Sequence, residues 1–312
     1  MIDTEEPTRH IVSVGGRRLS YLDYGGHGQP LLALHGHFGE ARTFTGLARG
    51  LSPDWRVIAL DQRGHGHSER PADFSRDGYL GDAAAFLDHL GITDAVVLGH
   101  SLGGVNAYQL AARHPSLVRA LVIEDIGAEV DDDLSLCLSW PERASSRAAL
   151  IEELAGSARY LADAFREHPD GWGLAFKPKD MVASQQQLNG DYWDDWLSSD
   201  CPALLIHGTR SDVLSAQHAR DMADRRPRTR LVELTERRQF REDAGIDEPL
   251  VLDITDRRSS DTGSELRRFM DYMSVTASWG RCCSSSGWSR GTARPPGRWT
   301  GREVVSRTGA GC

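Results

Sequence analysis

Short apolar runs of strand length alternate with amphipathic, helix-like segments along the chain as far as Leu234. This alternation is typical of a mostly parallel β-sheet covered by helices on both faces. The predicted strands are Ile11–Val14, Leu19–Tyr24, Leu31–His35, Arg56–Leu60, Ala95–Leu98, Ala120–Ile123, Ala203–His207 and Arg230–Leu234. The predicted helices are Ala41–Leu51, Tyr79–Leu90, Gly104–Arg113 and Ala216–Arg225. We therefore expect an α/β fold with a mostly parallel, doubly wound sheet of about eight strands, the first two forming an antiparallel edge hairpin.

The alternation lapses after the sixth predicted strand. Residues 128–199 have helical propensity, and we interpret them as a helical cap inserted into a core that comprises residues 1–127 and 200–234. The tryptophans of this insert would either line an aromatic vestibule beside the acidic run Asp191–Trp196 or pack into its interior. They are Trp140, Trp172, Trp193 and Trp196.

The composition changes again after Leu234. Residues 235–279 form an atypical C-terminal segment, although Leu266, Phe269, Met270 and Met273 keep helical spacing within it. Residues 280–312 are dominated by Gly, Ser, Arg and Pro. We expect this tail to be disordered, because such a composition cannot bury a core.

Charge and apolar content narrow the classes of function. A net charge of −9 argues against a nucleic-acid partner, and an apolar share of 39% is sufficient for a sizeable core. Because no apolar run approaches the length of a signal-peptide core or a membrane span, we expect a cytoplasmic protein without a membrane partner. The five cysteines have no metal-ligand spacing. The sequence does not indicate an oligomeric state.

The fifth predicted strand runs directly into Gly99-His-Ser101-Leu-Gly103, and a predicted helix follows. In a strand–turn–helix context, Gly-x-Ser-x-Gly predicts a nucleophile elbow, a turn so tight that the serine hydroxyl is lifted clear of the sheet. The N-terminus of the following helix then directs N–H groups and a favourable dipole toward the reacting centre. We therefore predict Ser101 as a catalytic nucleophile.

Acyl transfer through a serine also needs an oxyanion hole. One donor would be the backbone N–H of Leu102, which directly follows the nucleophile. The second is expected in the loop after the third strand, His35-Gly-His-Phe-Gly39, where glycines let the backbone approach a developing negative charge. We assign it to the backbone N–H of His37, with that of Phe38 as the alternative.

Three motifs follow successive strands in a recognisable order: His35-Gly36, then Asp61-Gln-Arg-Gly-His-Gly-His-Ser68, then Gly99-His-Ser-Leu-Gly103. Together they resemble the α/β-hydrolase superfamily, and the resemblance covers about Ile11 to Leu234. It implies a serine hydrolase with a cap and without a cofactor, acting on a small-molecule ester, thioester, lactone or activated amide. A serine at the elbow argues against the relatives that open epoxides or displace halide, which carry aspartate there.

In that family the acid of the triad follows the penultimate strand. Here the strand Ala203–His207 leads to Asp212, which we therefore predict to orient the catalytic base. An ordinary helix-capping role is the alternative for this residue. Glu124 and Asp125, after the sixth strand, provide another position for the acid.

Two His-Gly-His sequences, one containing His35 and His37 and the other His65 and His67, raise the question of a metal site. Their loops carry no adjoining partners with metal-ligand spacing, so we predict that no metal is bound. The nearby Asp61 and Arg63 are expected to brace their own loop rather than to contact substrate.

The family places its catalytic histidine just after the last strand, but no histidine follows His218 in this chain. Arginine is no base near neutral pH, because its pKa lies above about 12. Other histidines are weak substitutes. His100 is expected to pack away from the serine, His218 to lie exposed on an outer helix, and His37 or His67 to border the pocket at most.

Losing a triad member typically costs about 10⁴–10⁶ in turnover. Without a substitute base the chain would have the architecture of a hydrolase and little activity. One explanation is a frameshift near codon 235 that replaced the native ending, since the tail has the Arg, Gly, Ser and Pro content of GC-rich DNA read out of register. A genuine non-catalytic binding protein with this fold is the alternative.

Overall fold

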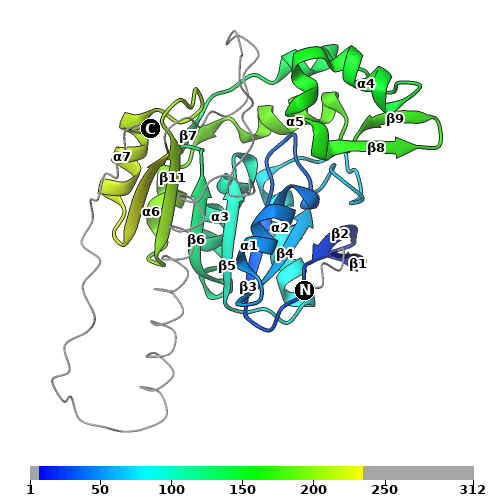
Figure 1. Cartoon of the computed structure of the whole chain (residues 1–312). Helices are drawn as coiled ribbons and strands as arrows, with labels where there is room; N and C mark the ends of the chain where they lie inside the picture. The colour runs from blue at the N-terminus through cyan, green and yellow to red at the C-terminus, as the bar shows by residue number, and fades with distance from the viewer. Residues whose placement is uncertain (1–6, 235–312) are drawn as a thin grey trace, which may run out of the picture.

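The structure, a computed structural model, describes residues 7–234 and contains an eight-stranded sheet in the order β1-β2-β4-β3-β5-β6-β11-β12 (Figure 1). From β4 to β12 neighbouring strands are parallel, whereas β1 and β2 pair antiparallel at one edge. The strands are β1 (Thr8–Val14), β2 (Arg17–Asp23), β3 (Gln29–Leu34), β4 (Trp55–Asp61), β5 (Ala95–His100), β6 (Val118–Glu124), β11 (Ala203–Gly208) and β12 (Thr229–Leu234). All eight predicted strands and the edge hairpin are thus confirmed.

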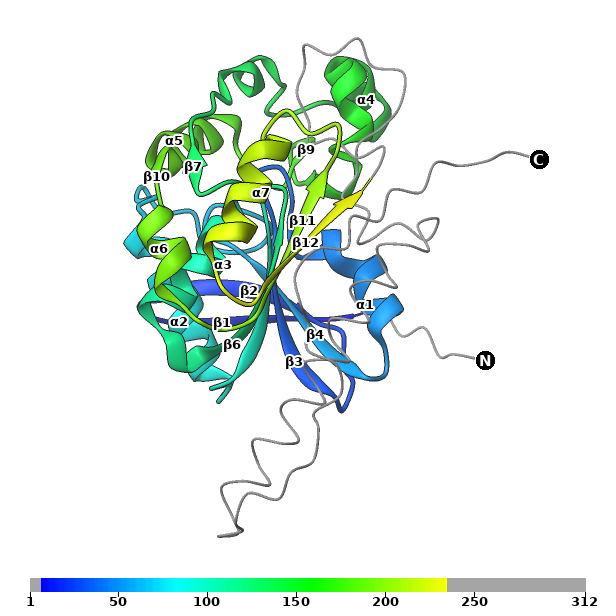
Figure 2. The same cartoon turned by 90° about the vertical axis from the view of Figure 1, so that its left-hand side faces the viewer.

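Helices cover both faces of the sheet, as Figure 2 shows. On one face lie α2 (Arg76–His89), α3 (Leu102–Arg113), α6 (Trp193–Ser198) and α7 (Ala216–Arg225). On the other, α1 (Thr45–Leu51) follows a 3-10 turn over Ala41–Phe44. Central strands such as β5 read as unbroken apolar runs because alternate side chains are buried on opposite faces. The expected α/β architecture is correct.

The segment of residues 129–191 rises above the ends of the strands, in green at the top of Figure 1. It has an apolar cluster of its own, which includes Cys137, Trp140, Leu150 and Met181. Its elements are β7 (Glu129–Val130), a 3-10 turn over Ser135–Ser139, α4 (Arg147–Leu154), 3-10 turns over Ala155–Arg159 and Ala162–Ala164, β8 (Phe165–His168), β9 (Gly171–Leu174), α5 (Pro178–Leu188) and β10 (Gly190–Asp191).

The insert, interpreted from the sequence as a helical cap, contains helices α4 and α5 and also short strands. Strands β8 and β9 form an antiparallel hairpin, and β10 pairs with β7. The hairpin turns through His168-Pro-Asp-Gly171, where Gly171 has a φ of 128°. Pro-Asp-Gly is a strong turn signal, and helical propensity masked it in the sequence.

Two of the four tryptophans of the insert, Trp140 and Trp196, are buried. Trp196 is fully buried between α6 and α3, where its ring meets Tyr108 edge-on and its Nε1–H donates to the carbonyl oxygen of Met222. Trp140 is buried in the cluster of the insert. For these two residues the packing role is confirmed.

No helix within residues 7–234 is long and apolar enough to cross a membrane. The expectations for residues 235–312, including disorder of the tail and a frameshifted ending, lie outside the described residues.

Candidate active site

Ser101 lies at the junction of β5 and α3 with a φ of 50° and a ψ of −119°. Positive φ in a residue with a side chain costs about 1–3 kcal/mol and persists only where the surroundings impose it. The Ser101 N–H donates to the carbonyl oxygen of Glu124 on β6, and its own carbonyl accepts from Gly104 and Val105 in the first turn of α3. The strand–turn–helix geometry predicted for this motif is therefore present.

Close backbone packing explains why glycines flank the serine. A Cβ on Gly103 would overlap the carbonyl oxygen of Leu34 at the end of β3, and one on Gly99 would overlap the Gly103 carbonyl. Gly36 faces the serine itself, since a Cβ there would lie 3.2 Å from the Cβ of Ser101. The turn can thus be made only where these positions have no side chain.

The loop after β3 brings His37, the predicted oxyanion donor, next to this turn through its neighbour Gly36. The Gly36 carbonyl accepts from the Gly39 N–H at 3.1 Å and contacts His35 Nδ1 at 2.8 Å. Because the peptide unit is planar and trans, the His37 N–H points opposite to that carbonyl. Within residues 7–234, neither this N–H nor that of Leu102 donates a hydrogen bond.

The side chain of His37 connects this loop to the insert. Its Nε2 lies 2.9 Å from the Ser184 hydroxyl on α5, which in turn lies 2.8 Å from the Tyr79 hydroxyl on α2. All three side chains are buried. Sequence reasoning missed Ser184 and Tyr79, because only the fold brings such distant positions together.

A second chain of hydrogen bonds, formed by side chains of α2, α3 and the loop after β4, ends at the same loop. Arg76 donates to Asn106 Oδ1, Asn106 Nδ2 donates to Gln62 Oε1, and Gln62 Nε2 donates to the carbonyl oxygen of His35. The donors follow one another in the same direction, an arrangement in which each bond polarises the next. Asn106 and Gln62 had carried no signal in the sequence.

The two predicted positions for the acid differ sharply in environment. Asp212 is exposed, and no described side chain donates a hydrogen bond to it. Asp125, at the end of β6, is buried and accepts from the Ser211 hydroxyl at 2.9 Å through Oδ2. Its Oδ1 is also buried and has no partner among the described residues. Burial raises the pKa of Asp125 to about 7.

None of the four histidines considered as substitute bases has suitable surroundings. Burial lowers the pKa of His100 to about 3, and its Nδ1 faces Gly36. His218 is half-buried rather than exposed, and its Nε2 accepts from the Ala128 N–H at 3.0 Å. His37 contacts Ser184, and His67 is exposed.

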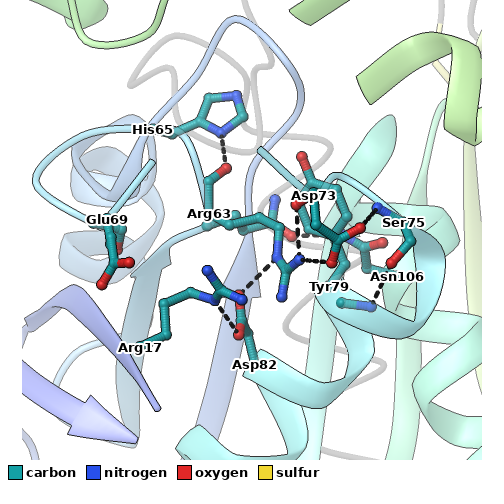
Figure 3. A network of polar contacts seen from close by, with 12 residues as sticks. Arg17, Arg63, His65, Glu69, Asp73, Ser75, Tyr79, Asp82 and Asn106 are labelled. Carbon is teal, nitrogen blue, oxygen red and sulfur yellow. Dashed lines mark hydrogen bonds and ion pairs between the residues drawn. The ribbon is translucent and has the colours of Figure 1, made fainter. Parts of the chain in front are cut away.

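Asp61 and Arg63 brace loops, as predicted. Figure 3 shows the Arg63 guanidinium between Asp82 on α2 and Asp73, with Arg17 on the far side of Asp82. Asp61 is fully buried and accepts from the backbone N–H groups of Ala41 and His67. Both residues therefore fix the loop that follows β4.

The two His-Gly-His loops do meet, with the rings of His35 and His65 4.7 Å apart. Their nitrogens, however, are engaged by backbone groups: the Gln62 N–H donates to His35 Nε2, and both nitrogens of His65 face carbonyl oxygens. Within the described part of the chain, no three His, Cys, Asp or Glu side chains are arranged to hold a metal ion.

Comparison with known proteins links this geometry to one family. The family described as "alpha/beta hydrolase fold" matches residues 29–174. A 2-hydroxymuconate semialdehyde hydrolase from Pseudomonas putida is 30% identical over 242 residues, which is 72% of this chain and 84% of that protein. A 2-(acetamidomethylene)succinate hydrolase from Mesorhizobium japonicum is 28% identical over 211 residues, which is 61% of this chain and 74% of that protein.

Solved structures agree on the fold. The crystal structure of E-2-(acetamidomethylene)succinate hydrolase superposes with a TM-score of 0.68 at 24% identity, covering 75% of this chain and 92% of that chain. At this level of identity the likeness concerns the arrangement of the backbone.

Gly103→Ala is expected to destabilise the protein by about 2–3 kcal/mol or more, because the added methyl group meets backbone rather than a flexible side chain. The matched control is Gly81→Ala on the exposed face of α2, where nothing lies within 4 Å. This change should stabilise by about 0.5–1 kcal/mol. Urea unfolding of both variants tests these expectations. Equal midpoint urea concentrations for Gly103→Ala and Gly81→Ala would contradict the packing argument.

Burial holds the pKa values of His35, His37, His65 and His100 below the ordinary value of 6.5. Below that pH the unfolded chain takes up protons that the folded protein does not, so stability should fall as the pH drops from 7 to 5, by about 2–5 kcal/mol.

Asp125 acts with the opposite sign, because its folded pKa of about 7 lies above the unfolded value. The folded protein holds this proton at pH 5, which offsets part of the loss. Asp125→Asn should therefore make the fall between pH 7 and pH 5 steeper. Denaturant midpoints across this range test both statements, and a stability that rises toward pH 5 would refute the first.

Proposed function

This chain belongs to the α/β-hydrolase family, and on that basis we propose that it is a serine hydrolase. The substrate would be a small ester, thioester, lactone or activated amide, and Ser101 would accept the acyl group before water removes it. The observation that carries the proposal is the strained backbone of Ser101 at the N-terminus of α3. This is the turn that presents a nucleophile in such enzymes.

The proposed reaction has two acyl-transfer steps. The hydroxyl oxygen of Ser101 attacks the carbonyl carbon, and its proton passes to a base. The negative charge that develops on the carbonyl oxygen is stabilised by the N–H groups of His37 and Leu102 and by the dipole of α3. The leaving group departs with a proton, and water then attacks the acyl-serine. None of these steps requires a metal or a cofactor.

For the orienting acid, the contacts favour Asp125 over Asp212. An orienting carboxylate must be fixed and able to accept from the imidazole of the base. Asp125 is fixed by Ser211 and keeps one buried oxygen without a described partner, whereas Asp212 is exposed. An imidazolium beside Asp125 would also lower the pKa of this carboxyl from about 7 and keep it ionised.

The base that would accept the proton of Ser101 is the component that the described residues do not supply. The family position of the histidine falls after Leu234, where the chain has no histidine at all. Turnover is therefore expected to be about 10⁴–10⁶ below that of a complete triad. The same observation favours a second candidate function, in which the protein binds its ligand without hydrolysing it.

Labelling with a fluorophosphonate probe separates the two functions. The serine hydrolase predicts a covalent adduct at residue 101, detectable by mass spectrometry, and none in Ser101→Ala. Folded wild-type protein that stays unlabelled after prolonged exposure would refute the hydrolase and support the binding function.

Added imidazole tests which carboxylate, that of Asp125 or that of Asp212, orients the base. If the missing base is the main defect, imidazole should accelerate hydrolysis of p-nitrophenyl acetate by the wild-type protein above the rate measured with Ser101→Ala. Asp125→Asn should reduce this gain by about 100-fold, because the acid no longer orients the imidazole. Asp212→Asn is the matched control, with an expected change within about threefold. The reverse ranking would restore Asp212 as the acid.

A further inference from the structure

His65 is a buried histidine that the proposed chemistry does not use. It lies in the loop after β4 and is 1% exposed. Each of its ring nitrogens faces a backbone carbonyl: Nδ1 lies 2.9 Å from the oxygen of Arg63, as Figure 3 shows, and Nε2 lies 2.8 Å from the oxygen of His37. The second contact joins this loop to the one that carries the predicted oxyanion donor.

The His37 N–H lies in the peptide plane before its Cα, and the plane after that Cα anchors the residue from its other side. The plane before it is held through the Gly36 carbonyl. His35 Nε2 accepts from the Gln62 N–H, so a neutral His35 carries its proton on Nδ1 and donates it to Gly36. The Gly39 N–H donates to the same oxygen.

The plane after His37 is held through its own carbonyl, and in the described structure the partner of that oxygen is His65 Nε2. With both planes fixed, neither backbone torsion of residue 37 can rotate freely. Without the contact to His65, one of the two planes is released. The position of an oxyanion donor matters on a scale of tenths of an ångström, since useful donors lie about 2.7–3.1 Å from the oxyanion.

We propose that His65 is a positioning residue for the oxyanion hole, whose Nε2–H donates to the His37 carbonyl and so keeps the His37 N–H directed at the reacting carbonyl oxygen. This inference rests on the proposed function, because it concerns the same site.

The proposal fixes the tautomer of His65. A neutral imidazole has one N–H and can serve only one of the two carbonyls at a time. Burial lowers the pKa of His65, so the neutral form prevails near pH 7.5. The proton must then reside on Nε2, and the Arg63 carbonyl faces the nitrogen without a proton.

The experiment measures inactivation by the fluorophosphonate probe in the full-length protein, separating its limiting rate, kinact, from its binding constant, KI. His65→Phe keeps a ring and removes both nitrogens, and should lower kinact by about 10–100-fold with KI unchanged. His65→Gln keeps an amide N–H and should recover part of the loss. The control is His89→Phe, an exposed histidine near the end of α2, with no expected change.

Two results would overturn the positioning role while the proposed function stands. One is a kinact for His65→Phe and His65→Gln that falls only in proportion to the unfolded fraction, measured by thermal melting, or does not fall. The other is a long-range ¹H–¹⁵N spectrum of the wild-type protein at pH 7.5 that places the proton of His65 on Nδ1. If wild-type Ser101 is not labelled at all, the proposed function fails and the positioning role fails with it.

Discussion

The structure depends on one crowded junction, where the turn between β5 and α3 presses against the end of β3. The backbone of Gly103 approaches that of Leu34 there, Gly36 lies against the side chains of His100 and Ser101, and residue 101 is held with a φ of 50°. The strain is local, and its cost of about 1–3 kcal/mol is offset by burial of the central strands on both sides of the sheet. Its effect is to place Ser101 at the N-terminus of α3.

The same junction determines what surrounds the hydroxyl of Ser101. Gly36 contacts the serine, so the next residue, His37, must lie beside it. That residue is tied to the sheet through the neighbouring loops and to the insert through Ser184. A movement of the insert would therefore reach the predicted oxyanion donor through a hydrogen bond to its side chain.

The strands and the elbow could be predicted because their signals are local: unbroken apolar runs, and glycines at fixed distances from a serine. The hairpin β8–β9 was missed because its turn signal lies in a segment of helical propensity. Asp125 and Asp212 differ in burial. The burial of each residue depends on which strands lie next to one another in the sheet, and the order of the strands along the chain does not reveal this. The same holds for His65, whose two carbonyl partners belong to different loops.

The most direct measurement is a crystal structure of the protein after reaction with a fluorophosphonate. The account predicts phosphorus bonded to Ser101 Oγ and the phosphoryl oxygen about 2.7–3.1 Å from the backbone nitrogens of both His37 and Leu102. An adduct whose phosphoryl oxygen points away from these two nitrogens, or one on a different residue, would contradict it.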